Sequence, residues 1–184
     1  MTAIVASDIL FKLSITTGSA GNAATQPSPN ASLGKYISTT QLSGTALNNL
    51  FDDVSGAENT AGTTDYRCFF VHNNNASNIY QNAVVWLSGG DPAGGSTITI
   101  AVDTTAASAI GSATAQADVI ASETTAPTLV SAYSAPTTSG TGIALGNIGI
   151  GQCKAVWVKR VTSGAAAVNA ETVTFAVTGD TGAL

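Results

Sequence analysis

The stretch from Tyr66 to Ser88 is the densest run of strand-forming residues in the chain, and it constrains the fold most. Successive side chains of a strand point to opposite sides, so Cys68 and Phe70 face one way and Phe69 the other. Both faces are therefore largely apolar, which fits a strand inside a sandwich or at an intersubunit surface. The Asn-rich residues 72–78 predict a turn between this strand and a second one, because Asn tolerates left-handed backbone angles.

Further strands are expected where apolar or β-branched residues alternate between Gly, Pro and Asn. They cover 36–40, 97–102, 118–121, 128–133, 143–145, 152–161 and 171–178. The last of these alternates most regularly, with Val173, Phe175 and Val177 predicted to face inward. Roughly eight to ten strands at such spacings predict an all-β fold, an antiparallel β-sandwich of jelly-roll or immunoglobulin-like type.

One short helix of about two turns is predicted within residues 43–56. Leu47, Leu50 and Val54 recur there at helical spacing, and Gly56 can end the helix. The acidic residues around it lack the alternating ligands of a calcium loop, so we interpret them as a solvated acidic loop.

The amino-terminal part is expected to be organised differently from the rest. Phe11, Leu13 and Ile15 alternate with polar residues and predict one strand, and a segment rich in Gly, Ser, Ala and Pro follows it. This strand is either an extended arm that reaches a neighbour or an ordinary edge strand before a long loop. We therefore divide the chain into an amino-terminal strand and flexible arm, 1–34, and a β-sandwich domain, 35–184.

Two cysteines, Cys68 and Cys153, flank Trp86 in the order found in immunoglobulin domains. Their separation is long for such a domain, and Gly151 stands where the tyrosine corner would place a Tyr. We expect both cysteines to be reduced and buried, because the chain is expected to stay in the cytosol where it is made.

The composition excludes several classes of partner. The net charge is −5, with only six Lys and Arg residues. These are too few cations to neutralise the phosphates of a bound nucleic acid. No apolar run approaches the ~20 residues of a membrane span, and the first residues lack the basic start of a secretion signal. Charged residues make up 9% of the chain, against about 25% in ordinary domains, which suits a surface covered by neighbours.

No constellation of catalytic or metal-binding residues is visible in the sequence. The only histidine is His72, and Cys68 lies four residues away along the same strand, at about 13 Å, too far for a hydrogen bond. His, Cys and carboxylate residues do not occur at metal-ligand spacing, and the glycines form no nucleotide-binding motif. We expect a non-enzymatic protein without a cofactor or metal, in which His72 is structural.

Four parts of the chain resemble a family of virion structural proteins of tailed bacteriophages. They are YISTTQLSGTALNNLFDDVSGAENTAGTTDYRCFFVHNNNAS, NAVVWLS, IALGNIGIGQCKAVWVKRV and ETVTFAVTGD, which together cover most of Tyr36–Thr178. The resemblance implies a capsid decoration or cement protein that binds the major capsid protein, stabilises the phage head and associates with itself, as a trimer. The expected location is the virion, assembled in the host cytoplasm.

Three further hypotheses accompany this resemblance. Phe11, Leu13 and Ile15 are the predicted partner contact, by adding a strand to an adjacent subunit. A tail-fibre or baseplate component is the alternative within the virion. A carbohydrate-binding sandwich ranks last, because strand aromatics are more often core residues than stacking faces; its candidate stacking residues are Tyr80, Trp86, Tyr133 and Trp157.

Overall fold

The computed structural model describes residues 3–18, 24–89, 95–111, 114–164 and 171–182. Within these ranges the chain forms nine strands: β1 (Ile9–Ile15), β2 (Tyr36–Gln41), β3 (Thr64–Asn73), β4 (Ile79–Gly89), β5 (Ser96–Val102), β6 (Ser108–Ala109), β7 (Ile143–Ile148), β8 (Gln152–Thr162) and β9 (Thr174–Gly182). The helical elements are η1 (Ala6–Asp8), η2 (Pro29–Ala31), α1 (Gly56–Ala61) and η3 (Ser139–Thr141).

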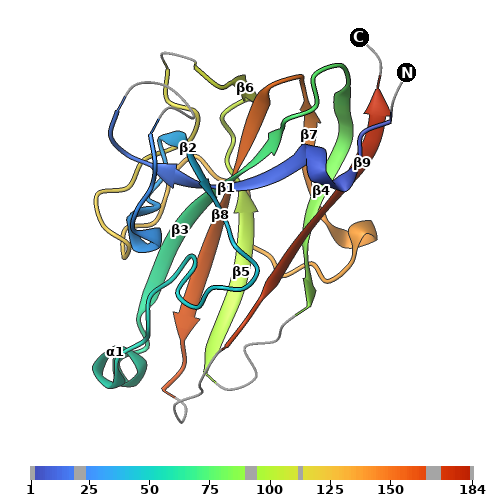
Figure 1. Cartoon of the computed structure of the whole chain (residues 1–184). Coiled ribbons are helices and arrows are strands. Elements are labelled where there is room, and N and C mark those ends of the chain that lie inside the picture. The colour runs from blue at the N-terminus through green and yellow to red at the C-terminus, as the bar shows by residue number, and fades with distance from the viewer. Residues whose placement is uncertain (1–2, 19–23, 90–94, 112–113, 165–170, 183–184) are drawn as a thin grey trace.

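The strands form two antiparallel sheets (Figure 1), so the predicted all-β sandwich-like fold is confirmed. The large sheet has six strands in the order β2-β1-β3-β8-β5, with β6 also paired to β8. The small sheet has three strands in the order β7-β4-β9. The predicted turn after β3 therefore does not make a hairpin within one sheet, because it carries the chain from the large sheet to the small one.

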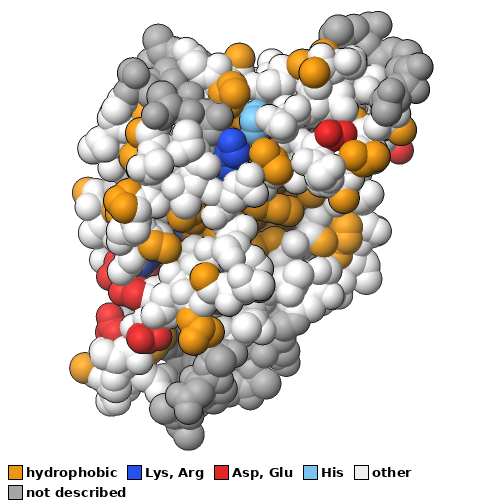
Figure 2. Space-filling view, in the orientation of Figure 1, with side chains coloured by type: hydrophobic (Ala, Val, Ile, Leu, Met, Phe, Trp, Pro, Cys, Tyr) orange, Lys and Arg blue, Asp and Glu red, His pale blue; other side chains and the backbone are white. Residues whose placement is uncertain are grey.

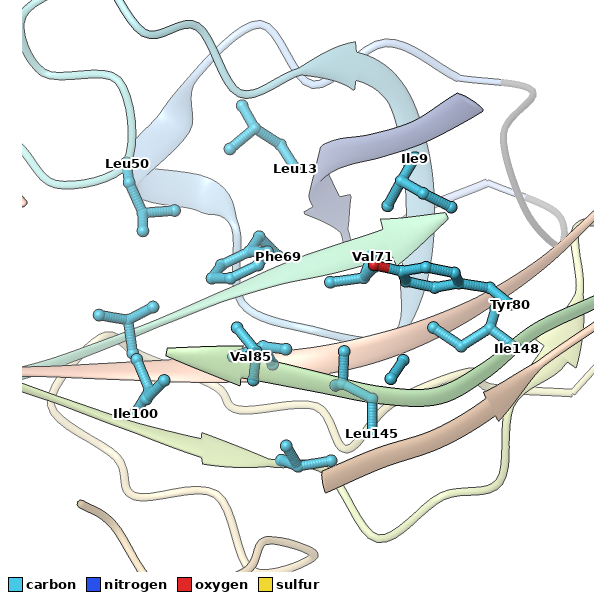
Figure 3. Packing of buried hydrophobic residues seen from close by; sticks show 14 of the residues in the cluster. Ile9, Leu13, Leu50, Phe69, Val71, Tyr80, Val85, Ile100, Leu145 and Ile148 are labelled. Carbon is cyan, nitrogen blue, oxygen red and sulfur yellow. The ribbon is translucent and has the colours of Figure 1, made fainter. Parts of the chain in front are cut away.

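The main hydrophobic core lies between the two sheets. Phe69 and Val71 from β3 point toward Tyr80 and Val85 from β4 (Figure 3). The large sheet also contributes valines and isoleucines from β5 and β8, and the small sheet adds Leu145 and Ile148 from β7. These side chains follow the period of two expected of strands that each turn one face to a common core.

A second core covers the opposite face of the large sheet. Cys68 and Phe70 from β3 lie there with Ala155 and Trp157 from β8, all four of them fully buried. Both faces of β3 and β8 are therefore covered, as the two-faced apolar pattern around Phe69 predicts. The large sheet is the middle layer of three, between the small sheet and a layer of loops.

The loop layer is built largely from the segment between β5 and β7. Residues 118–121 and 128–133, which the sequence predicts as strands, form only isolated bridges, Gly34 with Val119 and Asp103 with Val130. These segments are too short and too interrupted by Ser, Thr and Pro to form a ladder. They instead close the outer face of the large sheet, with Ile120 as a buried contact.

The structure places the amino-terminal strand inside the large sheet. β1 pairs with β2 on one side and with β3 on the other, with Phe11 opposite Val71 and Lys12 opposite Phe70. An arm carried away from the body is therefore not what the structure shows, and β1 is not an edge strand either. The reason is burial: Leu13 is 1% exposed in the core between the sheets, and detaching β1 would return it to water.

The helix lies later in the chain than predicted. Residues 43–55 form an irregular loop with bends and a turn at 47–48, and α1 occupies Gly56–Ala61. Its start is fixed by a capping box, in which the Ser55 side chain accepts from the Glu58 amide and the Glu58 carboxylate accepts from the Ser55 amide. The apolar spacing was misleading because its members do not share a buried face: Leu47 is 72% exposed, whereas Leu50 lies in the core between the sheets.

Candidate interaction surface

The three predicted partner contacts lie in β1 and are occupied within their own chain. Phe11 packs against Phe69, with ring centroids 5.6 Å apart. Leu13 is buried, and Ile15 pairs with Tyr36 of β2. Since both edges of β1 are already paired, these residues cannot add a strand to another subunit in this conformation.

His72 and the two cysteines do not form a catalytic pair. His72 lies directly opposite Cys153 on β8, but neither of its ring nitrogens forms a hydrogen bond with a described residue. Burial, with a smaller contribution from Lys12, lowers the pKa of His72 to about 4. Burial raises the pKa of Cys153 to about 12, so its thiol stays protonated at neutral pH.

Both cysteines are free, as predicted. Cys68 lies opposite Trp157 and Cys153 opposite His72, on neighbouring strands of the same sheet. An immunoglobulin disulfide joins the two sheets instead, so the Cys–Trp–Cys order does not reflect such a core. Burial also raises the pKa of Cys68, which makes this thiol a small hydrophobic core residue.

The densest group of charged side chains joins the loops to the ends of β3 and β8. Arg160 binds the Asp65 carboxylate at 2.9 Å, and the fully buried Arg67 pairs with Glu123 and, at 3.4 Å, with Asp52. The Phe51 ring lies beside both guanidinium groups, 5.3 Å and 4.6 Å from their central carbons. Both arginines have acidic partners within the chain. This group therefore holds the loops to the strands and is not an open binding site.

The four aromatics considered for carbohydrate binding are mostly core residues. Trp157 is fully buried and donates its indole N–H to Asp103 at 2.9 Å. Tyr80 is 5% exposed between the sheets, and Tyr133 packs on Tyr66 in the second core. Only Trp86 turns a half-buried ring to the outer face of the small sheet, and a single ring does not make a stacking platform.

Cations are distributed unevenly over the two sheets. Five of the six Lys and Arg residues lie in strands of the large sheet, and Lys35 comes directly before β2. The strands of the small sheet contain no Lys or Arg, and Asp180 is their only acidic residue. The small sheet therefore offers a partner an almost uncharged surface.

The core-facing side chains of the small sheet are better covered on β7 than on β9. Leu145 and Ile148 of β7 are buried, whereas the inward-facing Phe175 and Val177 of β9 are only half-buried. Figure 2 shows apolar side chains gathering in the middle of the face that β1 crosses in Figure 1. The open side beside β9 is thus the candidate interaction surface of this molecule.

Sequence reasoning predicted β9 and its inward face but missed its position at the edge of a sheet. One signal was available in the sequence: the strand region TFAVTGDTG contains no Lys and no Pro. Exposed edges usually carry such residues, because they discourage pairing with other chains. An edge without them is available for strand pairing.

Among the described residues, no group of three or more His, Cys, Asp or Glu residues is placed to hold a metal ion. No helix in the described ranges is long and apolar enough to cross a membrane.

Comparisons with known proteins place the chain in no family. No family model, no curated protein and no solved structure matches it.

Proposed function

We propose that the protein is a non-enzymatic virion structural protein, a capsid decoration protein that binds the major capsid protein and stabilises the phage head. The resemblance of its sequence to virion proteins of tailed bacteriophages carries this proposal. The resembling segments contribute to β2, β3, β4, β7, β8 and β9, which belong to both sheets. They are therefore the parts of the chain that define the fold, and not one detachable loop.

Three features of the molecule support a binding role over a catalytic one. His72 and the cysteines are buried, and their pKa shifts favour uncharged, unreactive forms. The clustered ions of the described chain serve as a clamp between loops and strands. The small sheet combines an almost uncharged surface with an edge that no described residue pairs with, which suits apolar contact and main-chain pairing.

The test is binding to the particle. Purified protein is mixed with empty shells assembled from the major capsid protein of the same virus, and bound protein is measured by sedimentation. We expect saturable binding, and density for the protein on the outside of the shell in cryo-electron microscopy. In cryo-electron microscopy of the complete virion, density only on the tail would support the tail component instead, and no density on the particle would reject a virion role.

A further inference from the structure

Among the described residues, the outer edge of β9 has no backbone partner over most of its length. No backbone hydrogen bond joins β9 to any described residue other than its partners on β4. Only its end is covered, where the Ile4 amide donates to the Thr181 hydroxyl at 3.0 Å. Residues 174–180 therefore have, along one side, backbone donors and acceptors that no described residue pairs with.

The edge strands of the large sheet, unlike β9, form backbone hydrogen bonds with loop residues. Beyond β2, the Thr39 amide donates to the Ala24 carbonyl at 2.9 Å. Beyond β5, Ile100 and Ser134 exchange two backbone hydrogen bonds of 2.8 and 3.0 Å. The described chain thus covers part of each edge of its large sheet with its own loops.

In the small sheet, neither β7 nor β9 has a backbone–backbone hydrogen bond to a described residue beyond β4, but Leu145 and Ile148 of β7 are buried. The edge of β9 is therefore the one whose core-facing side chains are also incompletely covered.

The partial burial of the core-facing side chains of β9 agrees with an edge that has no described backbone partner. Val177 points into the core but stays half-buried, while Val85, opposite it on β4, is fully buried. Phe175 is half-buried as well, as is Leu87 opposite it on β4. Phe175 lies 4.9 Å from Phe69 at the margin of this core. An additional strand beside β9 would cover these side chains as β9 covers those of β4.

We propose that residues 174–180 of β9 bind an extended segment of the major capsid protein, which adds to the small sheet as a fourth strand. This inference rests on the proposed function and specifies the docking edge. Main-chain hydrogen bonds supply the affinity in this mode of binding, and alternate side chains supply the specificity. The incoming segment has apolar side chains facing Phe175 and Val177.

Charge defines the incoming segment further. Asp180 is exposed, and its carboxylate accepts only the Asn82 side-chain amide, at 3.1 Å, among the described residues. No Lys or Arg lies in the strands of the small sheet to balance it. A Lys or Arg of the incoming segment therefore lies opposite Asp180, where a charge-assisted hydrogen bond can form.

The decisive variant is Thr178→Lys, which places a cation on the exposed side of β9, two residues from Asp180. Lysine is a residue that natural edge strands use against pairing. The matched control is Thr97→Lys on β5, which is also an exposed strand threonine but belongs to the other sheet. Asp180→Asn, in turn, removes the charge and leaves the shape of the side chain.

Binding to empty shells is measured for all four proteins, with hydrogen–deuterium exchange of the β9 amides in the free and bound states. We expect Thr178→Lys to lose roughly tenfold in affinity, Asp180→Asn to lose less and to show a weaker salt dependence, and Thr97→Lys to bind as the wild type does. The amides of 174–180 become protected only when the shell is present.

The outcomes separate the docking edge from the function. If the wild type binds and Thr178→Lys binds equally well without protection of β9, the edge proposal is wrong and the decoration role stands. If the wild type does not bind shells, the proposed function fails and the docking edge with it. Protection of β9 that rises with protein concentration in the absence of shells would assign the edge to a second copy of this chain, and would also overturn the proposal.

Discussion

Single buried polar residues hold the loop layer on the large sheet. The fully buried Asp103 accepts the Trp157 indole N–H at 2.9 Å and the backbone amides of Asp118 and Thr105, each at 2.8 Å. Asp118 in turn accepts three further amides, from Val119, Thr128 and Leu129. These two carboxylates thereby accept hydrogen bonds from the backbone amides of a loop segment that forms almost no strand pairing of its own.

A glycine is needed where this layer touches the sheet. Gly34 has φ +90° and bridges to Val119. A Cβ at this position would lie 2.0 Å from the Asp118 carbonyl oxygen and 2.9 Å from the Trp157 ring. Only glycine accommodates both this backbone conformation and the close approach.

His72 makes the stability of the molecule depend on pH. It is 1% exposed, opposite Leu10 and Cys153, and the neighbouring cation is Lys12. Above pH 6.5 the imidazole is neutral in the folded and the unfolded chain and contributes no pH dependence. Below it the unfolded chain takes up a proton, while the folded chain does so only near its pKa of about 4.

We therefore predict that the free energy of unfolding falls by roughly 2–3 kcal/mol as the pH drops from 6.5 to 4, at about 1.4 kcal/mol per unit of pKa shift. The measurement is urea denaturation across this range for the wild type and for His72→Gln, which has no titrating ring. The difference between the two proteins isolates His72 from the carboxylates, whose lowered pKa values act at more acidic pH. A difference that stays constant from pH 7 to 4 would contradict a buried neutral His72.

At the scale of elements, β1 decides how the amino-terminal third is organised. It supplies Leu13 to the core between the sheets. On its other face, the Ser14 hydroxyl accepts the Gly34 amide at 2.9 Å. The strand therefore links the sandwich core to the loop layer and is an integral part of the large sheet.

We predict that Leu13→Ala lowers the free energy of unfolding by about 3 kcal/mol, because it leaves a cavity at a fully packed site. The control is Val5→Ala, at a residue before β1 that is 54% exposed, for which we expect a change within about 0.5 kcal/mol. Both are measured by chemical denaturation of the whole chain. Equal stability of Leu13→Ala and the wild type would show that β1 is detached in solution.

Much of the element pattern could be predicted from sequence, and the failures have physical causes. The two-faced β3 and the alternating β9 were predicted because burial on one or both faces leaves a period-two pattern. The helix was misplaced because apolar spacing outweighed the Ser55–Glu58 capping box, which marks its true start. The loop layer was missed because Asp103 and Asp118 organise it through hydrogen bonds that have no sequence period.

The candidate surface was harder to predict than the strands. The sequence indicated that Phe11, Leu13 and Ile15 form a strand, but pairing partners far along the chain decide whether a strand has a free edge. β1 is covered by β2 and β3, whereas β9 has a neighbour on one side only among the described residues. Strand order is therefore the information that the sequence did not supply.

At the scale of the whole molecule, three layers share one middle sheet. Cys68 and Cys153 lie between that sheet and the loop layer, at 0% and 1% exposure. Any opening of the loop layer that leaves the sandwich intact would expose them. Their reactivity therefore reports whether the layers unfold together or separately.

We predict that both thiols are inert toward a disulfide reagent in the native protein and react only in the urea range where the sheets unfold. The reason is that Asp103 and Arg67 tie the loops to buried positions of the large sheet, so the loop layer has little independent freedom. The rate of thiol modification is compared with the circular dichroism of the strands at each urea concentration. Modification at urea concentrations well below the loss of strand signal would reveal a loop layer that opens on its own.

The contact between Ile4 and Thr181 brings the two ends of the described chain to one corner of the molecule. A short linker there can join them, so the chain is suited to circular permutation, with new ends opened in an exposed turn such as the one around Ala76. It also means that a cargo fused to either end leaves the molecule from the same corner, beside the end of β9. Display of two different cargoes on one copy would therefore crowd them together, and a permuted chain would separate them.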